Sequence, residues 1–187
     1  MMHIIPRLAA LIARFGLRLL ALPAHLFAKR YLLAYAAGDI SWFDQGLYRL
    51  LRAELGGLHS ATLKCALITS AATPAKTTAD PRWGSGGTTN FSTNQVATGG
   101  TSYTGPITLA GQSVAVVTPN VLFRANIITL PQDASGFTNA RWAILYEDGA
   151  SKYAFAFLDL GSDRSIVSGQ LQIDWNGAND DILQLAN

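Results

Sequence analysis

The residues that could carry catalysis are few and scattered along this chain. His59 and Ser60 are adjacent at the start of an alternating apolar run, where neighbouring side chains of a strand point to opposite faces and are poorly placed to act as base and nucleophile. The GxSxG motif of a nucleophile elbow is absent from the sequence. The three histidines, at positions 3, 25 and 59, lack the spacing of metal ligands. The sequence therefore predicts a protein that is not an enzyme and has no catalytic residue.

Two further patterns superficially resemble ligand sites. Five aspartates gather near the end of the sequence: Asp159, Asp163, Asp174, Asp180 and Asp181. Their oxygen atoms could bind calcium, but the spacing is not that of an EF-hand, and aspartate is an ordinary turn residue. Gly84-Ser-Gly-Gly87 is glycine-rich like a phosphate-binding loop, yet no lysine follows in register and no helix is indicated after it. We therefore expect no metal and no cofactor.

Composition limits the class of protein. Apolar residues make up 49% of the 187 residues and charged residues only 14%, against roughly 25% charged residues in a typical soluble domain. A chain of this kind hides much of its surface, either in a membrane or in a protein assembly. Cys65 is the single cysteine, so neither an intramolecular disulfide nor a cysteine-based zinc site is expected.

Charge is distributed unevenly along the chain. Residues 1–38 contain no acidic residue and five basic ones, Arg7, Arg14, Arg18, Lys29 and Arg30. Residues 39–187 contain 9 basic and 12 acidic residues, a net charge of −3. A basic segment on a mildly acidic body favours contact with something anionic, such as nucleic acid, phospholipid or an acidic protein surface. We take the five basic residues as candidate interface residues.

Residues 1–38 have the pattern of a helical arm with a narrow basic stripe. Steps of 7, 4, 7 and 4 residues separate Arg7, Arg14, Arg18, His25 and Lys29. On a helix this spacing keeps the five side chains within about 40° of one line, while Pro23 should kink or divide the helix. We interpret the arm as a helix buried by neighbouring subunits of an oligomer.

Three other interpretations of the arm remain open. A cleaved signal peptide would need an uninterrupted apolar core, which Arg14 and Arg18 break. A transmembrane span needs about 20 apolar residues, whereas the longest charge-free stretch of the arm, from Leu19 to Ala28, has ten residues. A helix lying in a membrane interface fits the pattern better, although such helices usually have a wider polar face.

Residues 39–57 predict an amphipathic helix packed on the body. Apolar residues recur at helical spacing over about Ile40–Leu55, and Gly56-Gly57 ends the run. Asp39 or Ser41 is the expected N-cap.

The remaining body, residues 58–187, has short apolar runs separated by turn residues. Seven strands are predicted at Ala61–Thr69, Ser113–Val117, Val121–Leu130, Arg141–Tyr146, Tyr153–Leu158, Gln170–Trp175 and Ile182–Leu185. Glu147-Asp-Gly-Ala150 indicates a tight hairpin between two of them. Because no helical pattern intervenes, the chain is predicted to be mainly β, an antiparallel β-sandwich or jelly roll preceded by the N-terminal α-helical arm.

Residues 70–111 differ from the rest of the body. They are dominated by Thr, Ser, Gly and Ala and would form a very long loop inside a compact domain. We expect an extended excursion with short strands around Gln95–Ala97 and Thr101–Thr104, ordered by contact with a partner. A flexible linker is the alternative. Trp83 and Tyr103 lie in this excursion and are further candidate interface residues.

The order of several short motifs resembles a group of bacteriophage virion proteins. The motifs are Leu63-Lys-Cys-Ala-Leu-Ile-Thr-Ser70, Tyr103-Thr-Gly105, Ala140-Arg-Trp-Ala-Ile-Leu-Tyr-Glu-Asp-Gly149, Phe157-Leu-Asp-Leu-Gly161, Ile173-Asp-Trp175 and Ile182-Leu-Gln-Leu185. The resemblance covers about residues 40–187 and depends on order and spacing rather than on any single motif. The arm lies outside it and is expected to be an elaboration of this chain.

The resemblance implies a capsid decoration (cement) protein, or a related head or tail appendage, with a β-sandwich fold. We therefore expect a structural protein on the capsid surface of a virion, assembled in the host cytoplasm, that stabilises the capsid by docking through the β body and the arm. The expected partners are the major capsid protein or a neighbouring virion protein, together with further copies of the chain. A trimer is favoured over a dimer, nucleic acid is not expected as a partner, and a membrane is disfavoured.

Two other functions are compatible with the sequence. A tail or vertex fibre, or a receptor-binding module, would bind glycan through exposed aromatic residues such as Tyr103 or Trp83. A membrane-associated protein would be anchored by the N-terminal helix.

Overall fold

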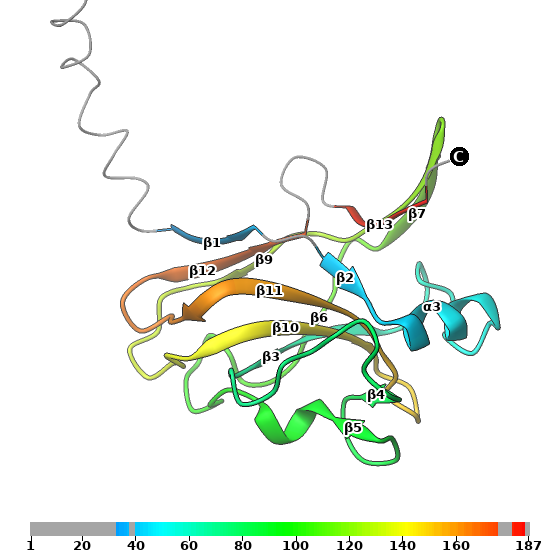
Figure 1. Cartoon of the computed structure of the whole chain (residues 1–187). Coiled ribbons are helices and arrows are strands. Elements are labelled where there is room, and N and C mark those ends of the chain that lie inside the picture. Colours follow the sequence, from blue (N-terminus) through cyan, green and yellow to red (C-terminus); the bar gives the residue numbers. More distant parts are fainter. Residues whose placement is uncertain (1–32, 38–39, 176–180, 186–187) are drawn as a thin grey trace, which may run out of the picture. The chain divides into compact units, whose positions relative to one another are not determined.

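The computed structural model describes residues 33–37, 40–175 and 181–185 (Figure 1). Within these ranges the chain is mainly β, with one α-helix, α3 (Asp44–Leu51), and one short 3-10 helix, η1 (Phe91–Asn94). Almost all strand pairs are antiparallel. The prediction of a mainly β chain is confirmed.

The described strands form four sheets. The central sheet contains, in order, β2 (Ile40–Trp42), β11 (Ala154–Arg164), β10 (Ala140–Glu147), β3 (Leu63–Ile68) and β6 (Ile107–Thr108). The second sheet contains β1 (Leu33–Ala37), β12 (Gln170–Asp174) and β9 (Ile128–Leu130). The third sheet contains β13 (Asp181–Leu185), β8 (Asn120–Arg124) and β7 (Ser113–Val117). The short strands β4 (Pro81–Arg82) and β5 (Thr89–Asn90) pair in parallel.

The central sheet is buried on both faces. Along β3, Leu63, Cys65 and Leu67 join the larger hydrophobic cluster, whereas Ala66 and Ile68 join a second cluster. The larger cluster also contains side chains of β9 and β12, so the central and second sheets share a core. This arrangement explains why β3 has apolar residues at successive positions and not only at alternate ones.

The Thr/Ser/Gly-rich excursion covers the opposite face of the central sheet. Trp83 and Phe91 are almost completely buried and belong to the same cluster as Ile144 and Phe157 of the sheet. These two large aromatic rings anchor this part of the excursion on the sheet, while Val96, Tyr103 and Leu109 of the same excursion are buried in the larger cluster. The excursion is therefore ordered by its own chain, and the expectation that a partner would be needed to order it is corrected.

The strands expected within the excursion are largely absent from the described chain. Gln95 makes only an isolated bridge with Ile68, and Thr101–Thr104 contains no strand. Instead, the carboxylate of Asp133 accepts hydrogen bonds from the backbone N–H groups of Thr101 and Ser102. The N–H groups of Ser102, Ser135 and Thr101 lower the pKa of Asp133 because they stabilise its charged form. Hydrogen bonds from the backbone to the side chain of Asp133 thus fix this segment in place of the predicted strand pairing.

A hairpin between β10 and β11 is confirmed by their register, but its loop runs over residues 148–152 and its positive φ is at Lys152, so the Asp-Gly pair does not form the tight turn expected. Their antiparallel pairing brackets Asp148 and Gly149, and Glu147 N donates to Tyr153 O over 3.0 Å. β11 is longer than predicted and continues to Arg164. The predicted single strand Val121–Leu130 is divided into β8 and β9, because the backbone leaves the ladder near Asn126, whose N–H donates to Ala110 O.

The helix predicted over Ile40–Leu55 is shorter than expected. Ile40–Trp42 is a strand that pairs with β11, and the indole N–H of Trp42 donates to the carbonyl of Ile182 over 3.0 Å. Phe43 occupies the N-cap position of α3 without a side-chain capping bond. The expected N-cap at Ser41 is therefore wrong. Asp39, the other expected N-cap, lies outside the described ranges. Pairing with a strand far along the chain overrides the local helical spacing.

The predicted arm falls mostly outside the described residues. The residues of the arm that are not described include Arg7, Arg14, Arg18, Lys29 and Arg30. Residues Leu33–Ala37, which were assigned to the arm, form β1 beside β12. The helical interpretation does not extend to these five residues, because their backbone groups find partners in a sheet.

Replacing Gly46 of α3 with alanine should destabilise the fold by about 2 kcal/mol. An added Cβ would lie 2.5 Å from the carbonyl oxygen of Phe155 and 2.7 Å from its Cα, so α3 would have to move away from β11. Gly99→Ala is the matched control, because the Cβ position of Gly99 is open. Urea unfolding should give a lower midpoint for Gly46→Ala only, and equal midpoints would contradict the close packing of α3.

Candidate interaction surface

One face of the third sheet is entirely apolar at the positions where its three strands align. The register places Val114 opposite Phe123 and Phe123 opposite Leu183, and it places Val116 opposite Val121 and Val121 opposite Leu185. Directly opposite residues of antiparallel strands have side chains on the same face. We call these six residues the apolar sheet face. They form two rows of three residues across the sheet.

The apolar sheet face is open to solvent in its outer row. Val116 is 76% exposed, Leu185 is 53% exposed and Val121 is 38% exposed. The inner row is better covered, since Phe123 is buried, although Val114 remains 48% exposed. In Figure 1 the hairpin that contains β7 extends beyond the central sheet. Contiguous exposed apolar side chains of this kind mark interaction sites in natural proteins.

An apolar groove lies between this face and the segment around α3. It has a volume of about 240 Å³ and is lined only by apolar residues, among them Leu50 of α3, Leu58 and Phe123. Two large side chains of α3, Tyr48 and Leu51, are also exposed, and Leu51 reaches 87%. The groove lacks the converging polar groups that orient a small-molecule substrate. It therefore suits an apolar side chain of a partner better than a metabolite.

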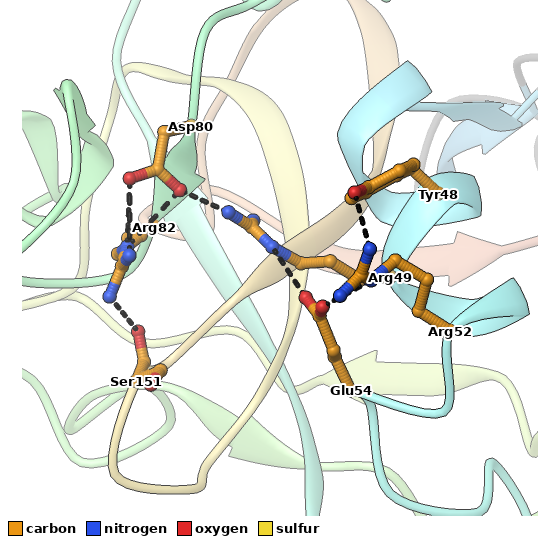
Figure 2. Close-up of polar contacts among 7 residues, drawn as sticks. All are labelled: Tyr48, Arg49, Arg52, Glu54, Asp80, Arg82 and Ser151. Atoms are coloured by element: carbon orange, nitrogen blue, oxygen red, sulfur yellow. Dashed lines mark hydrogen bonds and ion pairs between the residues drawn. The ribbon is translucent and has the colours of Figure 1, made fainter.

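A network of two arginines and one aspartate holds α3, the wall of the groove, in place. Figure 2 shows Arg49 of α3 and Arg82 of β4 approaching the same carboxylate, that of Asp80. Arg82 Nη2 lies 3.1 Å from Asp80 Oδ2, and Arg49 Nη2 donates to Asp80 Oδ1. We call this set, with the ring of Tyr153, the arginine network. It ties α3 to the excursion.

Tyr153 adds an aromatic surface to the arginine network. The guanidinium carbon of Arg49 lies 3.8 Å from the ring centroid and that of Arg82 lies 4.7 Å from it, distances at which a cation is attracted to the ring. Arg82 Nη1 also donates to Ser151 O over 3.5 Å. Arg49 is 7% exposed, so its charge needs these partners. The network pairs both cations, while Arg49 Nη1 is buried and has no hydrogen-bond partner in the described part of the chain.

Burial and the two arginines act in opposite directions on the carboxyl of Asp80. Burial raises its pKa, whereas the hydrogen bonds from Arg82 and Arg49 and their positive charges lower it, and the net pKa is below the ordinary value. Because the charged form is favoured in the folded state, this stabilisation is present above the unfolded-state pKa. It is lost as the pH falls through the lower, folded-state pKa.

The structure places the two aromatic candidate residues in the core. Trp83 stacks on Tyr146 with ring centroids 5.5 Å apart. Tyr103 packs edge-on against Phe137, its hydroxyl accepts a hydrogen bond from Leu67 N over 3.0 Å, and burial raises its pKa to about 12. Their exposures of 5% and 1% correct the expectation that these rings are displayed to a glycan or a partner. The five basic candidates of the arm lie outside the described ranges.

Several aspartates that resembled calcium ligands have arginine partners instead. Asp159 pairs with Arg141 at 3.0 Å, and Asp181 pairs with Arg124 at 2.5 Å. Across residues 33–37, 40–175 and 181–185, no three His, Cys, Asp or Glu side chains are grouped in a way that could hold a metal ion.

Sequence reasoning identified the strands of the apolar sheet face but missed the face itself. The available signal was Ser113–Val117, in which valines occur on both alternating sets of positions with no charged residue. A strand with one solvated face normally alternates apolar and polar residues. The absence of that alternation could have indicated a contact on both faces.

Replacing Asp80 with asparagine should lower the free energy of unfolding by about 2 kcal/mol at pH 7, because Arg49 and Arg82 lose a charged partner. The difference from the unmodified chain should shrink as the pH falls below about 4, because the unfolded chain then binds the proton first and the native carboxylate follows at its lower pKa. Asp163→Asn, at an exposed position of β11, is the control. Urea unfolding at pH 7 and pH 3 measures the free energy of unfolding of the two variants and of the unmodified chain. A deficit that does not change with pH would refute the proposed charge pairing.

Within the described ranges no helix is long and apolar enough to span a membrane. Comparison of the chain with protein-family models, with curated proteins and with solved structures found no match.

Proposed function

We propose that this chain is a structural protein of a bacteriophage virion that decorates and stabilises the capsid. The observation that carries the proposal is the apolar sheet face, whose outer row is exposed on a chain with 14% charged residues. Large exposed apolar patches favour assembly with another protein. The resemblance of the motif order to virion decoration proteins, over about residues 40–187, favours the capsid as that protein.

The interior of the body also supports a passive, structural role. We propose that the central and second sheets form a β-sandwich, because their inward side chains meet in one cluster that contains Leu67, Ala143 and Ile173. Its charged side chains are used to fasten loops, as in the arginine network. A rigid body with an apolar contact surface is suited to reinforcing a shell.

Burial would supply the docking free energy. An aliphatic side chain that becomes fully buried contributes on the order of 1.5–3 kcal/mol, and the three outer-row residues begin 38–76% exposed. The gain is reduced by the loss of translational and rotational freedom on binding. A single copy would therefore bind weakly, but many copies fixed on one particle would add to its mechanical resistance.

The arm would contribute a second contact. Its five basic residues and its apolar residues are well suited to a neighbouring subunit whose body has a net charge of −3. We propose that it locks adjacent subunits together, with a trimer favoured and the major capsid protein as the shared support. A receptor-binding role is less well supported, because Trp83 and Tyr103 are buried.

Replacing Leu185 with aspartate should reduce binding to the virion by at least about tenfold, because a buried unpaired carboxylate costs more than the 1.4 kcal/mol that corresponds to this factor. Ile127→Asp is the matched control, since Ile127 is also an exposed aliphatic residue, at 38%, but is outside the apolar sheet face. Purified particles assembled without the chain are incubated with each variant, and bound protein is quantified after sedimentation. Equal binding of both variants would contradict docking through this face, and absence of the native chain from purified virions would refute the proposed function.

Deleting residues 1–32 should lower the occupancy of the chain on virions and the temperature at which particles release their genome. The deletion stops at residue 32 so that β1, which begins at Leu33, is kept. A variant with the arm sequence scrambled controls for length and net charge. Particle composition and release temperature are compared with those of native virions. Unchanged occupancy and heat resistance would refute the locking role of the arm.

A further inference from the structure

The outer edge of β7 is an unprotected strand edge. In the third sheet β7 pairs with β8 on one side, and no described strand pairs with its other side. All five residues of β7 are exposed, and its pairing with β8 has no bulge. Natural proteins usually protect such an edge with a charge, a proline or a bulge within the strand, because its free N–H and C=O groups can recruit another strand. Ser113–Val117 has none of these protections.

Most other edges of the described sheets are shorter or less regular than β7. The central sheet ends in β6, which has two residues, and in β2, which has three. Very short edge strands are themselves a protection against pairing. The far edge of the third sheet, β13, carries the Asp181 carboxylate and a register irregularity next to it. β1, an edge of the second sheet, also has five residues, but β7 is exposed at every residue and borders the apolar sheet face, so we take its edge as the pairing site.

Charge favours a second copy of this chain as the occupant. No charged residue occurs between Arg82 and Arg124, so β7 itself carries no charge, and the one charged residue of the β7–β8 hairpin, Arg124, is paired with Asp181. The body as a whole has a net charge of −3, and two bodies repel one another wherever their acidic surfaces meet. An uncharged edge is one place where two copies can meet without that repulsion, and it offers no charge to attract a differently charged partner.

We propose that two copies of the chain pair antiparallel through β7, around a two-fold axis at Ala115. In this register Ala115 lies opposite Ala115 of the second copy, and Val114 lies opposite Val116. A two-fold contact of this kind uses the same surface on both partners, so it would join a subunit of one trimer to a subunit of the next and not subunits within one trimer. The result is a continuous sheet of six strands.

The proposed register joins the two apolar sheet faces. The row Val116, Val121 and Leu185 of one copy continues into the row Val114, Phe123 and Leu183 of the other, since residues opposite one another share a face. Two small patches thereby become one platform with twice the number of apolar residues. The pairing itself needs no capsid, so it can be tested separately from the proposed function.

The size of the contact indicates a weak dimer in free solution. Stable interfaces bury about 800 Å² on each partner, whereas a β7 edge offers five residues. The dimer should therefore be populated at high local concentration and strengthened when the joined platform is covered. A covalent trap is the suitable probe for a contact of this strength.

Ala115→Cys in the full-length chain provides that trap. Directly opposite residues of antiparallel strands have Cα atoms about 4.5–5.5 Å apart, which a disulfide can bridge. The native Cys65 is fully buried and burial raises its pKa to about 12, so it should not cross-link while the chain is folded. Under mild oxidation, Ala115→Cys should give a covalent dimer at least about tenfold faster than Ala134→Cys, an exposed loop control. Equal rates would overturn the proposal.

A second substitution tests whether the trapped contact depends on β7 pairing. Adding Val116→Lys to Ala115→Cys should slow cross-linking by at least about tenfold, because it places like charges close together across the axis. Adding Ala134→Lys instead should leave the rate unchanged. Val116 is 76% exposed, and an unchanged urea midpoint will verify that the lysine variant folds. If both lysine variants cross-link equally fast, the β7 pairing is refuted.

Discussion

The central sheet must be covered on both faces, and much of the described fold follows from this constraint. Its strands carry apolar residues on both sides, as β3 does with Leu67 on one face and Ile68 on the other. The second sheet covers one face. The excursion covers the other with Trp83 and Phe91, which explains how a Thr/Ser/Gly-rich segment becomes ordered. Few large aromatic residues suffice because the remaining polar backbone is fixed by side chains such as Asp133.

The third sheet differs from the central sheet because one of its faces has no complete cover within the described chain. The outer row of the apolar sheet face remains exposed, while the arginine network fixes α3 beside the groove. The charged side chains of the arginine network thus hold α3 beside an apolar groove.

Local sequence patterns predicted most strands but not their partners. Ser113–Val117 was delimited correctly and the hairpin between β10 and β11 was placed correctly, because both depend on neighbouring residues. The local spacing predicts a helix at Ile40–Trp42 because the strand partner of these residues, β11, lies more than a hundred residues away. The apolar sheet face was missed for a similar reason. Val116, Val121 and Leu185 become one surface only when β7, β8 and β13 are aligned.

The strand order of the central sheet has a consequence for how the chain reaches its folded state. The β10–β11 hairpin is the one local pairing in that sheet, whereas β2 and β3 pair with strands that follow them at long sequence separation. Closing long loops costs entropy before any contact repays it. We expect the hairpin to form first and to act as a template for β2 and β3. Substitutions in the hairpin should then slow folding, whereas substitutions in β2 should chiefly accelerate unfolding.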